Sequence, residues 1–358
     1  MTFPRFSKTS RLWCVLTAVM CLGLSAETPS AQASTTTQAT PKKTTTKKTI
    51  TRKTTTSRTL SSSSVRRARA RSRAAVQARL LREAQEPRFR LDDSGALVPD
   101  VRAEAAIIYD SATGHVLWES NSQNQRSIAS ITKVMTAVVF MEDSPDLSEE
   151  VVVQPSDVRA ASTTYIRSGY RVTKGDLLHL TLMASDNAAA RALARVSSRG
   201  SEAFIERMNT KAAELGLQST SYSDPSGLLA ANVSSAYDMA KLISYVSGDE
   251  RIASVMRKQT YTVNAGRRVV NIHSTNQLVM NGDVDVQAGK TGFISKSGYC
   301  LATLLRLPQG GPPVAVVVLG AKSNAGRFWE TRHLFNWFAS KAEDLLGTPL
   351  QAATATAN

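Results

Sequence analysis

Strand-like segments lie near both ends of the part of this chain that can fold, and helical segments lie between them. Residues 105–120, AAIIYDSATGHVLWES, have the pattern of two strands joined by a turn. Three more strands are expected at 283–293, 299–307 and 314–321, with Gly- and Pro-rich turns between them. Short connections favour antiparallel pairing. The order therefore predicts an α+β fold in which both ends of a domain build one antiparallel sheet and helices pack on it.

Five helices are expected from the periodicity of apolar residues. We interpret Ser127 as the N-cap of the first helix, and Thr173 with Asp176 as a capping box for the second. Gly216 would end the third helix. The fifth is long and amphipathic. The predicted helical segments are 127–142, 173–198, 201–216, 236–248 and 326–346.

The first 33 residues have the organisation of a secretory signal. A basic head precedes an apolar run that is short for a membrane span, and a small-residue cleavage site follows. We expect cleavage after Ala33 and export to the periplasm. Cys14 and Cys21 would leave with this peptide. Cys300, in an apolar strand-like run, would then be a small buried hydrophobic residue.

The net charge of +15 is concentrated in one segment. Residues 34–90 carry +14 of it, whereas residues 91–358 are near neutral. Because this segment has few aromatic residues and export is expected, we predict no nucleic-acid partner. We favour a charged spacer, with anionic envelope polymers or lipid head groups as alternative partners. The expected segments are a signal peptide (1–33), a basic Thr/Ser/Arg-rich disordered segment with a marginal, solvated helix at 65–86 (34–96), a folded domain (97–346) and a disordered tail (347–358).

Ser130 and Lys133 form the first of three candidate catalytic motifs. On an α-helix three residues turn by about 300° and rise by about 4.5 Å, so the hydroxyl and the ε-amine share a face. A serine needs a base within hydrogen-bond reach to act as a nucleophile. Lysine can be that base only when it is neutral, so burial and a second cation would have to lower its pKa. A solvated lysine on a capped helix would give the same pattern.

Two further motifs could complete such a site. Ser185 and Asn187, expected within a helix, could relay a proton and hold an amide. Lys290, Thr291 and Gly292 lie on an expected strand. They would supply the second cation, a hydroxyl for a carboxylate and room for a peptide along the strand edge. Each motif alone is weak evidence. Chance supplies about one Ser-x-x-Lys in a chain of this length, and Ser122-Gln123-Asn124 and Lys296-Ser297-Gly298 resemble the other two motifs.

Together and in this order, Ser-x-x-Lys, Ser-Asp-Asn and Lys-Thr-Gly form the joint signature of active-site-serine penicillin-binding proteins and class A β-lactamases. Stretches such as DPSGLLAANVSSAYDMAKL extend the resemblance over roughly residues 97–345. The chain resembles low-molecular-weight penicillin-binding proteins, the D-alanyl-D-alanine carboxypeptidases and endopeptidases of serine peptidase family S11. This resemblance implies a penicillin-binding protein/serine β-lactamase-like fold. It also implies peptidoglycan stem peptides as substrates, β-lactams as inhibitors, and no metal or other cofactor.

The resemblance also assigns roles to residues. The nucleophile would be acylated after its lysine takes the proton, and two backbone N–H groups, of Ser130 and Phe293, would form the oxyanion hole. The implied catalytic residues are Ser130, Lys133 and Ser185. The implied substrate-binding residues are Asn187, Lys290, Thr291, Gly292 and Phe293.

Architecture favours an endopeptidase within this family. Many of its carboxypeptidases carry a β-rich domain and a terminal amphipathic anchor after the catalytic domain. Here few residues follow Gly292, and the expected strands and last helix use most of them. The resemblance therefore implies a DD-endopeptidase that cuts cross-links between stems through an acyl-serine intermediate, with a D-alanyl-D-alanine carboxypeptidase as the alternative.

Other classes of protein fit the sequence less well. A class A β-lactamase would need a deacylating glutamate in a Glu-x-x-x-Asn pattern between the second and third motifs, and none occurs there. A metallopeptidase would need clustered ligands, but the four histidines are scattered and only His179 and Asp186 have a ligand-like spacing. A non-catalytic wall-binding protein would use the basic segment and leave the three motifs unexplained.

Overall fold

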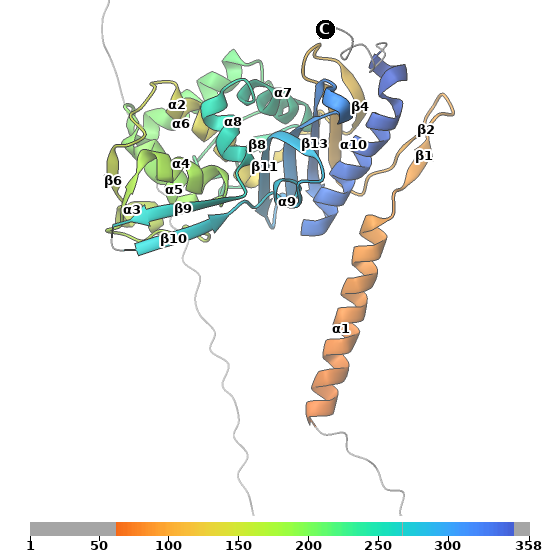
Figure 1. Ribbon diagram of the computed structural model, residues 1–358, viewed down its shortest axis with the longest axis horizontal. Helices are drawn as coiled ribbons and strands as arrows, with labels where there is room; N and C mark the ends of the chain where they lie inside the picture. Colours follow the sequence, from red (N-terminus) through yellow and green to blue (C-terminus); the bar gives the residue numbers. More distant parts are fainter. Residues whose placement is uncertain (1–61, 267, 347–358) are drawn as a thin grey trace, which may run out of the picture. The chain divides into compact units, whose positions relative to one another are not determined.

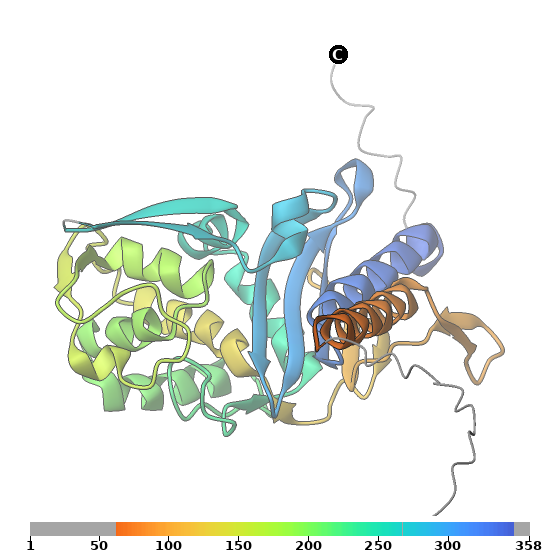
Figure 2. The same cartoon turned by 90° about the horizontal axis from the view of Figure 1, so that it is seen from below.

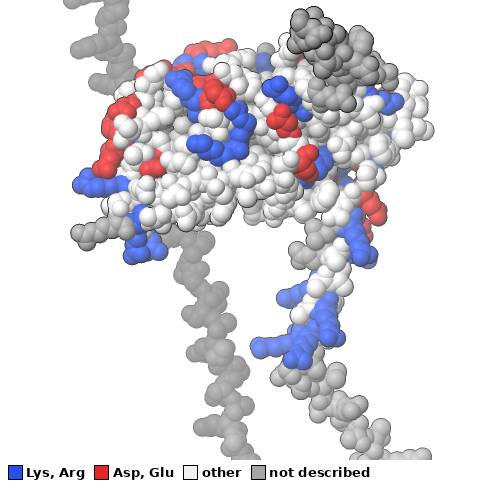
Figure 3. Space-filling model, viewed as in Figure 1, with Lys and Arg blue, Asp and Glu red and all other residues white. Residues whose placement is uncertain are grey.

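The computed structural model describes residues 62–266 and 268–346. The expected signal peptide, the first part of the basic segment and the expected tail lie outside the described residues. In the rest of the basic segment, α1 (Ser62–Gln85) occupies the stretch where we expected a marginal helix, and basic side chains line it (Figure 3). The hairpin of β1 (Phe89–Leu91) and β2 (Leu97–Pro99) follows. Regular structure thus begins before residue 97.

Five antiparallel strands form the central sheet, in the order β11-β12-β13-β3-β4. β3 pairs with β13, so Asp110 lies opposite Val314 and Ala105 lies opposite Leu319. Both ends of the folded region therefore build one sheet, which confirms the prediction. β11, which carries the third motif, lies at one edge (Figure 1). The strands are β3 (Ala105–Asp110), β4 (Val116–Ser120), β11 (Asp285–Ile294), β12 (Gly298–Arg306) and β13 (Pro313–Ala321).

Helices cover both faces of the sheet, which explains why β13 is an unbroken apolar run. Val316 and Val318 belong to the core under α10 (Asn324–Leu346), together with Phe328. The alternate residues of β13 belong to a second core, which includes α2 (Thr132–Met141) and α7 (Ala236–Val246). Figure 2 shows the sheet with α10 and α1 on one side and most of the other helices on the other. Cys300 is buried within this second core, as expected.

The second motif lies in a loop, which corrects the prediction of one helix over 173–198. α4 (Lys174–Leu182) ends before Ser185, where φ is +58°, and α5 (Asn187–Val196) then begins. Asp186 caps α5, because its carboxylate accepts the backbone N–H of Ala189 at 3.0 Å. Apolar residues recur at helical spacing on both sides of the break, so the sequence pattern predicts one continuous helix.

The start of the first predicted helix also differs from the expectation. Ser127 lies in β5 (Arg126–Ser127), and its buried hydroxyl has no hydrogen-bond partner among the described residues, so it is not an N-cap. A 3-10 helix, η1 (Ala129–Ile131), precedes α2 (Thr132–Met141), and every residue of α2 is buried. By contrast, the predicted capping box is present at the start of α4.

The other helices pack around α2, which contacts α4, α5, α6 (Gly200–Glu214) and α7. α6 ends just before Gly216, as expected. No helix in the described part of the chain is long and apolar enough to cross a membrane. The remaining elements are α3 (Pro155–Val158), α8 (Glu250–Arg257), α9 (Gln277–Asn281), η2 (Pro308–Gly310), β6 (Glu150–Val152), β7 (Arg171–Thr173), β8 (Val233–Ser234), β9 (Thr260–Ala265) and β10 (Arg268–His273).

Candidate active site

Ser130 lies in η1, immediately before α2. The preceding residue, Ala129, has a φ of +48°, in a region that residues with a side chain rarely adopt. Gly227 packs so closely against the Ala129 carbonyl that a Cβ there would collide with it. Nζ of Lys133 lies 2.9 Å from Oγ of Ser130. The spacing of the first motif therefore produces the expected contact between serine and lysine.

Lys133 is fully buried, and its amine has two further partners. Nζ donates to Oδ1 of Asn187 at 2.6 Å and to the carbonyl of Ser226 at 2.5 Å. Burial lowers the pKa of Lys133 from 10.5 to about 7, against the opposing charges of Asp186 and Asp224. Burial and a second cation were both expected to lower this pKa. Burial is the largest cause, and the cation that lowers it further is Arg191 rather than Lys290. A substantial fraction of the amine is therefore neutral at pH 7.

A loop organised by Asp224 brings the Ser226 carbonyl to Lys133. Oδ1 of Asp224 accepts the backbone N–H groups of Ser226 and Gly227 at 2.6 and 2.8 Å. Oδ2 accepts from the side-chain amide of Asn232 at 2.7 Å. Burial alone would raise the pKa of Asp224, but the hydrogen bonds outweigh it and lower that pKa. The sequence analysis gave Ser226 no role, although Asp-Pro-Ser-Gly is a recognisable turn sequence.

Ser185 and Lys290 form a second contact between serine and lysine. Nζ of Lys290 donates to Oγ of Ser185 at 2.9 Å and to the carbonyl of Thr291 at 3.0 Å. Burial, followed by the charges of Lys133 and Arg327, lowers the pKa of Lys290 well below its usual value. The two lysines therefore titrate as a coupled pair.

Gly292 lets β11 pass directly beside the nucleophile. A Cβ at this position would lie 2.6 Å from the carbonyl oxygen of Ile128 and 3.3 Å from the backbone nitrogen of Ile131. Any side chain here would therefore push the strand away from η1. The glycine was expected to make room for a bound peptide, and the close approach that the structure shows is between two segments of the protein itself.

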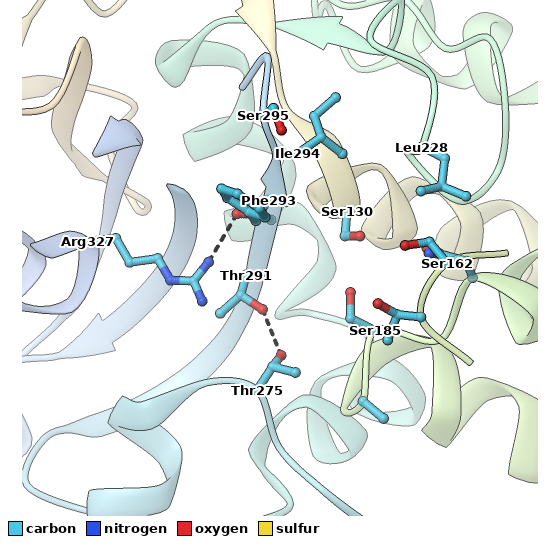
Figure 4. Close-up of a pocket in the computed structure, with 14 residues that line it drawn as sticks. Ser130, Ser162, Ser185, Leu228, Thr275, Thr291, Phe293, Ile294, Ser295 and Arg327 are labelled. Carbon is cyan, nitrogen blue, oxygen red and sulfur yellow. Dashed lines mark hydrogen bonds between the residues drawn. The ribbon is translucent and has the colours of Figure 1, made fainter. Parts of the chain in front are cut away.

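A pocket of about 550 Å³ opens between β11, η1 and the loop that carries Ser185 (Figure 4). Lys133 and Lys290 are buried behind its wall. The structure therefore brings all eight predicted site residues to one place. Those that line the pocket are Ser130, Ser185, Asn187, Thr291, Gly292 and Phe293.

Thr275 and Arg327 are two of the eight pocket residues that the sequence did not predict. Oγ1 of Thr275 lies 2.7 Å from Oγ1 of Thr291, and Nη1 of Arg327 donates to the carbonyl of Gly292 at 3.0 Å (Figure 4). Burial lowers the pKa of Arg327 to about 10, so the guanidinium remains charged at pH 7. No local signal identified Arg327, because α10 has the pattern of an ordinary amphipathic helix. The charge of Arg327 lies beside the hydroxyls of Thr275 and Thr291, an arrangement that suits binding of a carboxylate.

His179 has a structural role in α4. One ring nitrogen lies 2.8 Å from the carbonyl of Gly175, and the ring stacks on Tyr261 with centroids 3.7 Å apart. Within residues 62–346, apart from 267, no cluster of His, Cys, Asp or Glu could hold a metal ion.

Ser130 lies beside the edge strand of an antiparallel sheet, and two serine–lysine contacts converge on one pocket. This arrangement of fold and site defines a serine hydrolase of the penicillin-binding protein class. Peptidase family S11, described as D-alanyl-D-alanine carboxypeptidase, matches residues 93–323. The chain therefore belongs to the S11 family.

Individual relatives agree with this family. The D-alanyl-D-alanine endopeptidase of Escherichia coli is 33% identical over 67% of this chain and 78% of its own length. The D-alanyl-D-alanine carboxypeptidase DacC of the same organism is 33% identical over 67% of this chain and 62% of its own length. Among solved structures, penicillin-binding protein 6B of E. coli has a TM-score of 0.61 at 29% identity, covering 70% of this chain and 81% of that one.

A more compact relative has a similar fold. A mutant of the Streptomyces K15 DD-transpeptidase has a TM-score of 0.61 at 27% identity and covers 67% of this chain and 98% of that one. The expected fold class is thus confirmed.

Proposed function

We propose that this chain is an exported DD-endopeptidase that cleaves D-Ala-containing cross-links of peptidoglycan through an acyl-serine intermediate, and that β-lactams inhibit it by acylating Ser130. The observation that carries the proposal is the 2.9 Å contact between Ser130 and a buried lysine whose pKa is about 7. Such a lysine can take the proton of the hydroxyl as the hydroxyl attacks.

The partners of Lys133 support this direction of proton transfer. A neutral amine has two N–H groups and one lone pair. Oδ1 of Asn187 and the carbonyl of Ser226 can only accept, so they take the two N–H groups. The lone pair is then left for the hydroxyl of Ser130, which can donate. The neutral form of Lys133 is therefore held in the orientation that a general base requires.

The proposed acylation forms a bond between Oγ of Ser130 and the scissile carbonyl carbon, and breaks the bond from that carbon to the leaving nitrogen. The proton of Ser130 moves to Nζ of Lys133. The leaving amine needs a proton in turn, and the hydroxyl of Ser185, held by Lys290, is placed to relay it. Water then hydrolyses the acyl-enzyme and restores Ser130. The backbone N–H groups of Ser130 and Phe293 are the proposed oxyanion hole.

The proposed carboxylate site lies next to this chemistry. Thr291 and Thr275 present hydroxyls to the pocket, and Arg327 adds a charge that stays positive at pH 7. A carboxylate held there would place the adjacent amide near Ser130. β11 offers its free edge to the peptide backbone, which is the geometry of strand addition.

The relatives support an endopeptidase over a carboxypeptidase. Three proteins named D-alanyl-D-alanine endopeptidase are 32–33% identical over 78–83% of their own length. The carboxypeptidases are 28–33% identical over 61–63% of theirs. Export rests on the signal-like pattern of residues 1–33.

Labelled penicillin tests the acyl-serine mechanism. We expect the purified protein to take up one covalent label, and Ser130→Ala to take up none. Ser127→Ala is the matched control, because this buried serine lies three residues away and contacts no lysine. Equal labelling of Ser130→Ala and the wild type would refute the mechanism.

Digestion of cross-linked muropeptides tests the type of peptidase. An endopeptidase converts dimers into monomers, whereas a carboxypeptidase releases only terminal D-Ala. Product masses separate the two activities, and release of D-Ala alone would leave the carboxypeptidase alternative.

A further inference from the structure

A second pocket, of about 490 Å³, lies next to the catalytic pocket. We call it the outer pocket. Phe293 and Ser295 line both pockets, so a ligand can pass from one to the other along this part of β11 and its turn. In Figure 4 both residues lie on the strand side of the catalytic pocket. The proposed mechanism uses no side chain of the outer pocket.

An aromatic pair forms the boundary between the two pockets. The ring of Phe293 stacks on that of Tyr299, with centroids 4.2 Å apart and planes 24° from parallel. Phe293 is nevertheless 49% exposed. The Arg327 guanidinium lies 5.6 Å from the centroid of Tyr299. An exposed apolar ring at a strand edge next to a catalytic pocket offers a flat surface to a bound peptide.

The outer pocket carries an excess of positive charge. Lys296, Lys322 and Arg126 line it, and Glu104 is its one carboxylate. Glu104 pairs with Lys322. Arg126 and Lys296 form no ion pair with any residue from 62 to 346 apart from 267, whose contacts are not described. Two cations are thus available to an anionic ligand.

Arg126 is positioned by the local backbone. Gly320, with a φ of +76°, lies under its guanidinium, and a Cβ there would collide with it. Nε of Arg126 is buried without a hydrogen-bond partner among the described residues. The guanidinium therefore lies against Gly320 of β13, at the wall of the outer pocket, in space that a side chain at this position would take.

We infer that the outer pocket binds a carboxylate-bearing part of a peptide stem, remote from the amide that Ser130 attacks. This rests on the proposed function. A cross-linked substrate extends on both sides of the scissile amide, and it must leave the catalytic pocket in two directions. The outer pocket offers such a stem a ring to lie on and cations for its carboxylate. The ring and the cations are adjacent to Ser130 but lie outside the chemical step.

Removing the two cations without an ion-pair partner tests this inference. The double variant Arg126→Gln/Lys296→Gln keeps the Glu104–Lys322 pair and is compared with the wild type in cleavage of a muropeptide dimer. We expect KM to rise about tenfold and kcat to stay the same, because a contact with a distant stem stabilises bound substrate and transition state equally. The KM of the wild type should rise with salt, and that of the variant much less. Lys341→Gln removes an exposed charge on α10, outside both pockets, and should leave KM unchanged.

Binding to an inactive protein separates this inference from the proposed function. Ser130→Ala holds the dimer without turnover, and adding Arg126→Gln/Lys296→Gln should raise its Kd about tenfold. An uncross-linked stem ending in D-Ala-D-Ala identifies the source of the carboxylate. If the added double substitution weakens binding of both ligands, the bound carboxylate belongs to the stem on the acyl side. If it weakens binding of the dimer alone, the carboxylate belongs to the stem on the leaving side. An unchanged Kd for the dimer overturns the inference, whereas a wild type without penicillin labelling overturns the proposed mechanism.

Discussion

Lys133 must be neutral to accept the proton of Ser130, so its pKa sets the pH range of the proposed reaction. With that pKa at about 7, the neutral fraction falls about tenfold for each unit below pH 7 and levels off above it. We expect the second-order rate of penicillin labelling to follow this curve, with a midpoint near pH 7. Stopped-flow labelling from pH 5 to 9 measures it.

His179 provides the control for this pH profile. Histidine is the side chain whose ordinary pKa lies near neutrality, and burial lowers the pKa of His179 from 6.5. His179→Gln should keep the midpoint, because the ring contacts Gly175 and Tyr261 rather than the pocket. A midpoint that disappears in His179→Gln, or one above pH 9 in the wild type, would contradict the assignment to Lys133.

Gly227 is expected to be essential beside the nucleophile. Gly227→Ala places a Cβ against the Ala129 carbonyl and 3.0 Å from the backbone nitrogen of Ser130, at a φ of +77°. Gly169→Ala is the matched control, because Gly169 has a φ of +85° and open space around its Cα. The backbone conformation alone should cost each variant about 1–2 kcal/mol in urea unfolding. Gly227→Ala should lose more stability and most of its penicillin labelling.

The break between α4 and α5 is the element that places the second motif. The carboxylate of Asp186 caps α5 through Oδ1, and its Oδ2 accepts the backbone N–H of Tyr165 at 2.6 Å and the hydroxyl of Thr164 at 3.0 Å. One buried side chain thus fixes the start of α5, which carries Asn187, and the loop beside it. Ser185 is held between these two segments at a φ of +58°.

Asp186→Asn should disturb this loop more than an N-cap substitution normally does. An asparagine can still cap α5, but its NH₂ group would face the N–H of Tyr165, which also donates. We expect a loss of about 1–3 kcal/mol in unfolding free energy. Removing this charge should also lower the pKa of Lys133, since Asp186 raises it, and should move the labelling midpoint to lower pH.

Asp249→Asn is the control for that substitution. Asp249 caps α8 at the surface by accepting the backbone N–H of Arg251, and Asn is as good an N-cap as Asp. The carboxylate also pairs with the Arg251 guanidinium, a surface contact worth at most about 1 kcal/mol. The variant should therefore lose less than about 1 kcal/mol of stability and keep the wild-type labelling midpoint. If Asp186→Asn behaves in the same way, the proposed role of Asp186 is wrong.

The sequence predicted most elements, and the failures have local causes. Apolar periodicity identified α2, α6, α7 and α10, and the short connections identified the order of the last strands. Apolar periodicity did not identify the break at Ser185, because a single residue with a positive φ does not change the spacing of apolar residues. Ser127 appeared to be a cap because the 3-10 turn that separates it from α2 has no signature in the sequence. The three motifs were found because they are short and local, whereas Arg327 reaches the pocket only through tertiary packing.

At the scale of the whole molecule, the basic segment and the catalytic site are expected to act independently. The pocket is lined by residues between Ser130 and Arg327, none of them from α1. Deleting residues 34–86 should therefore leave the rate of penicillin labelling unchanged. The favoured spacer role also predicts unchanged sedimentation with peptidoglycan sacculi at low salt. If the deletion variant no longer sediments with sacculi, and a replacement segment with the same charges restores sedimentation, binding to anionic polymers would be supported instead.

The pairing of β3 with β13 has a consequence for the timing of folding. Asp110 and Val314 are opposite each other, so one central strand is synthesised some 200 residues before its partner. At typical rates of about 5–20 residues per second, this delay lasts about 10–40 s. Such a long-range contact also closes slowly once both strands exist. A chain with this connectivity remains without its central sheet until β13 has been synthesised, so the proposed export could begin on a chain whose sheet has not yet formed.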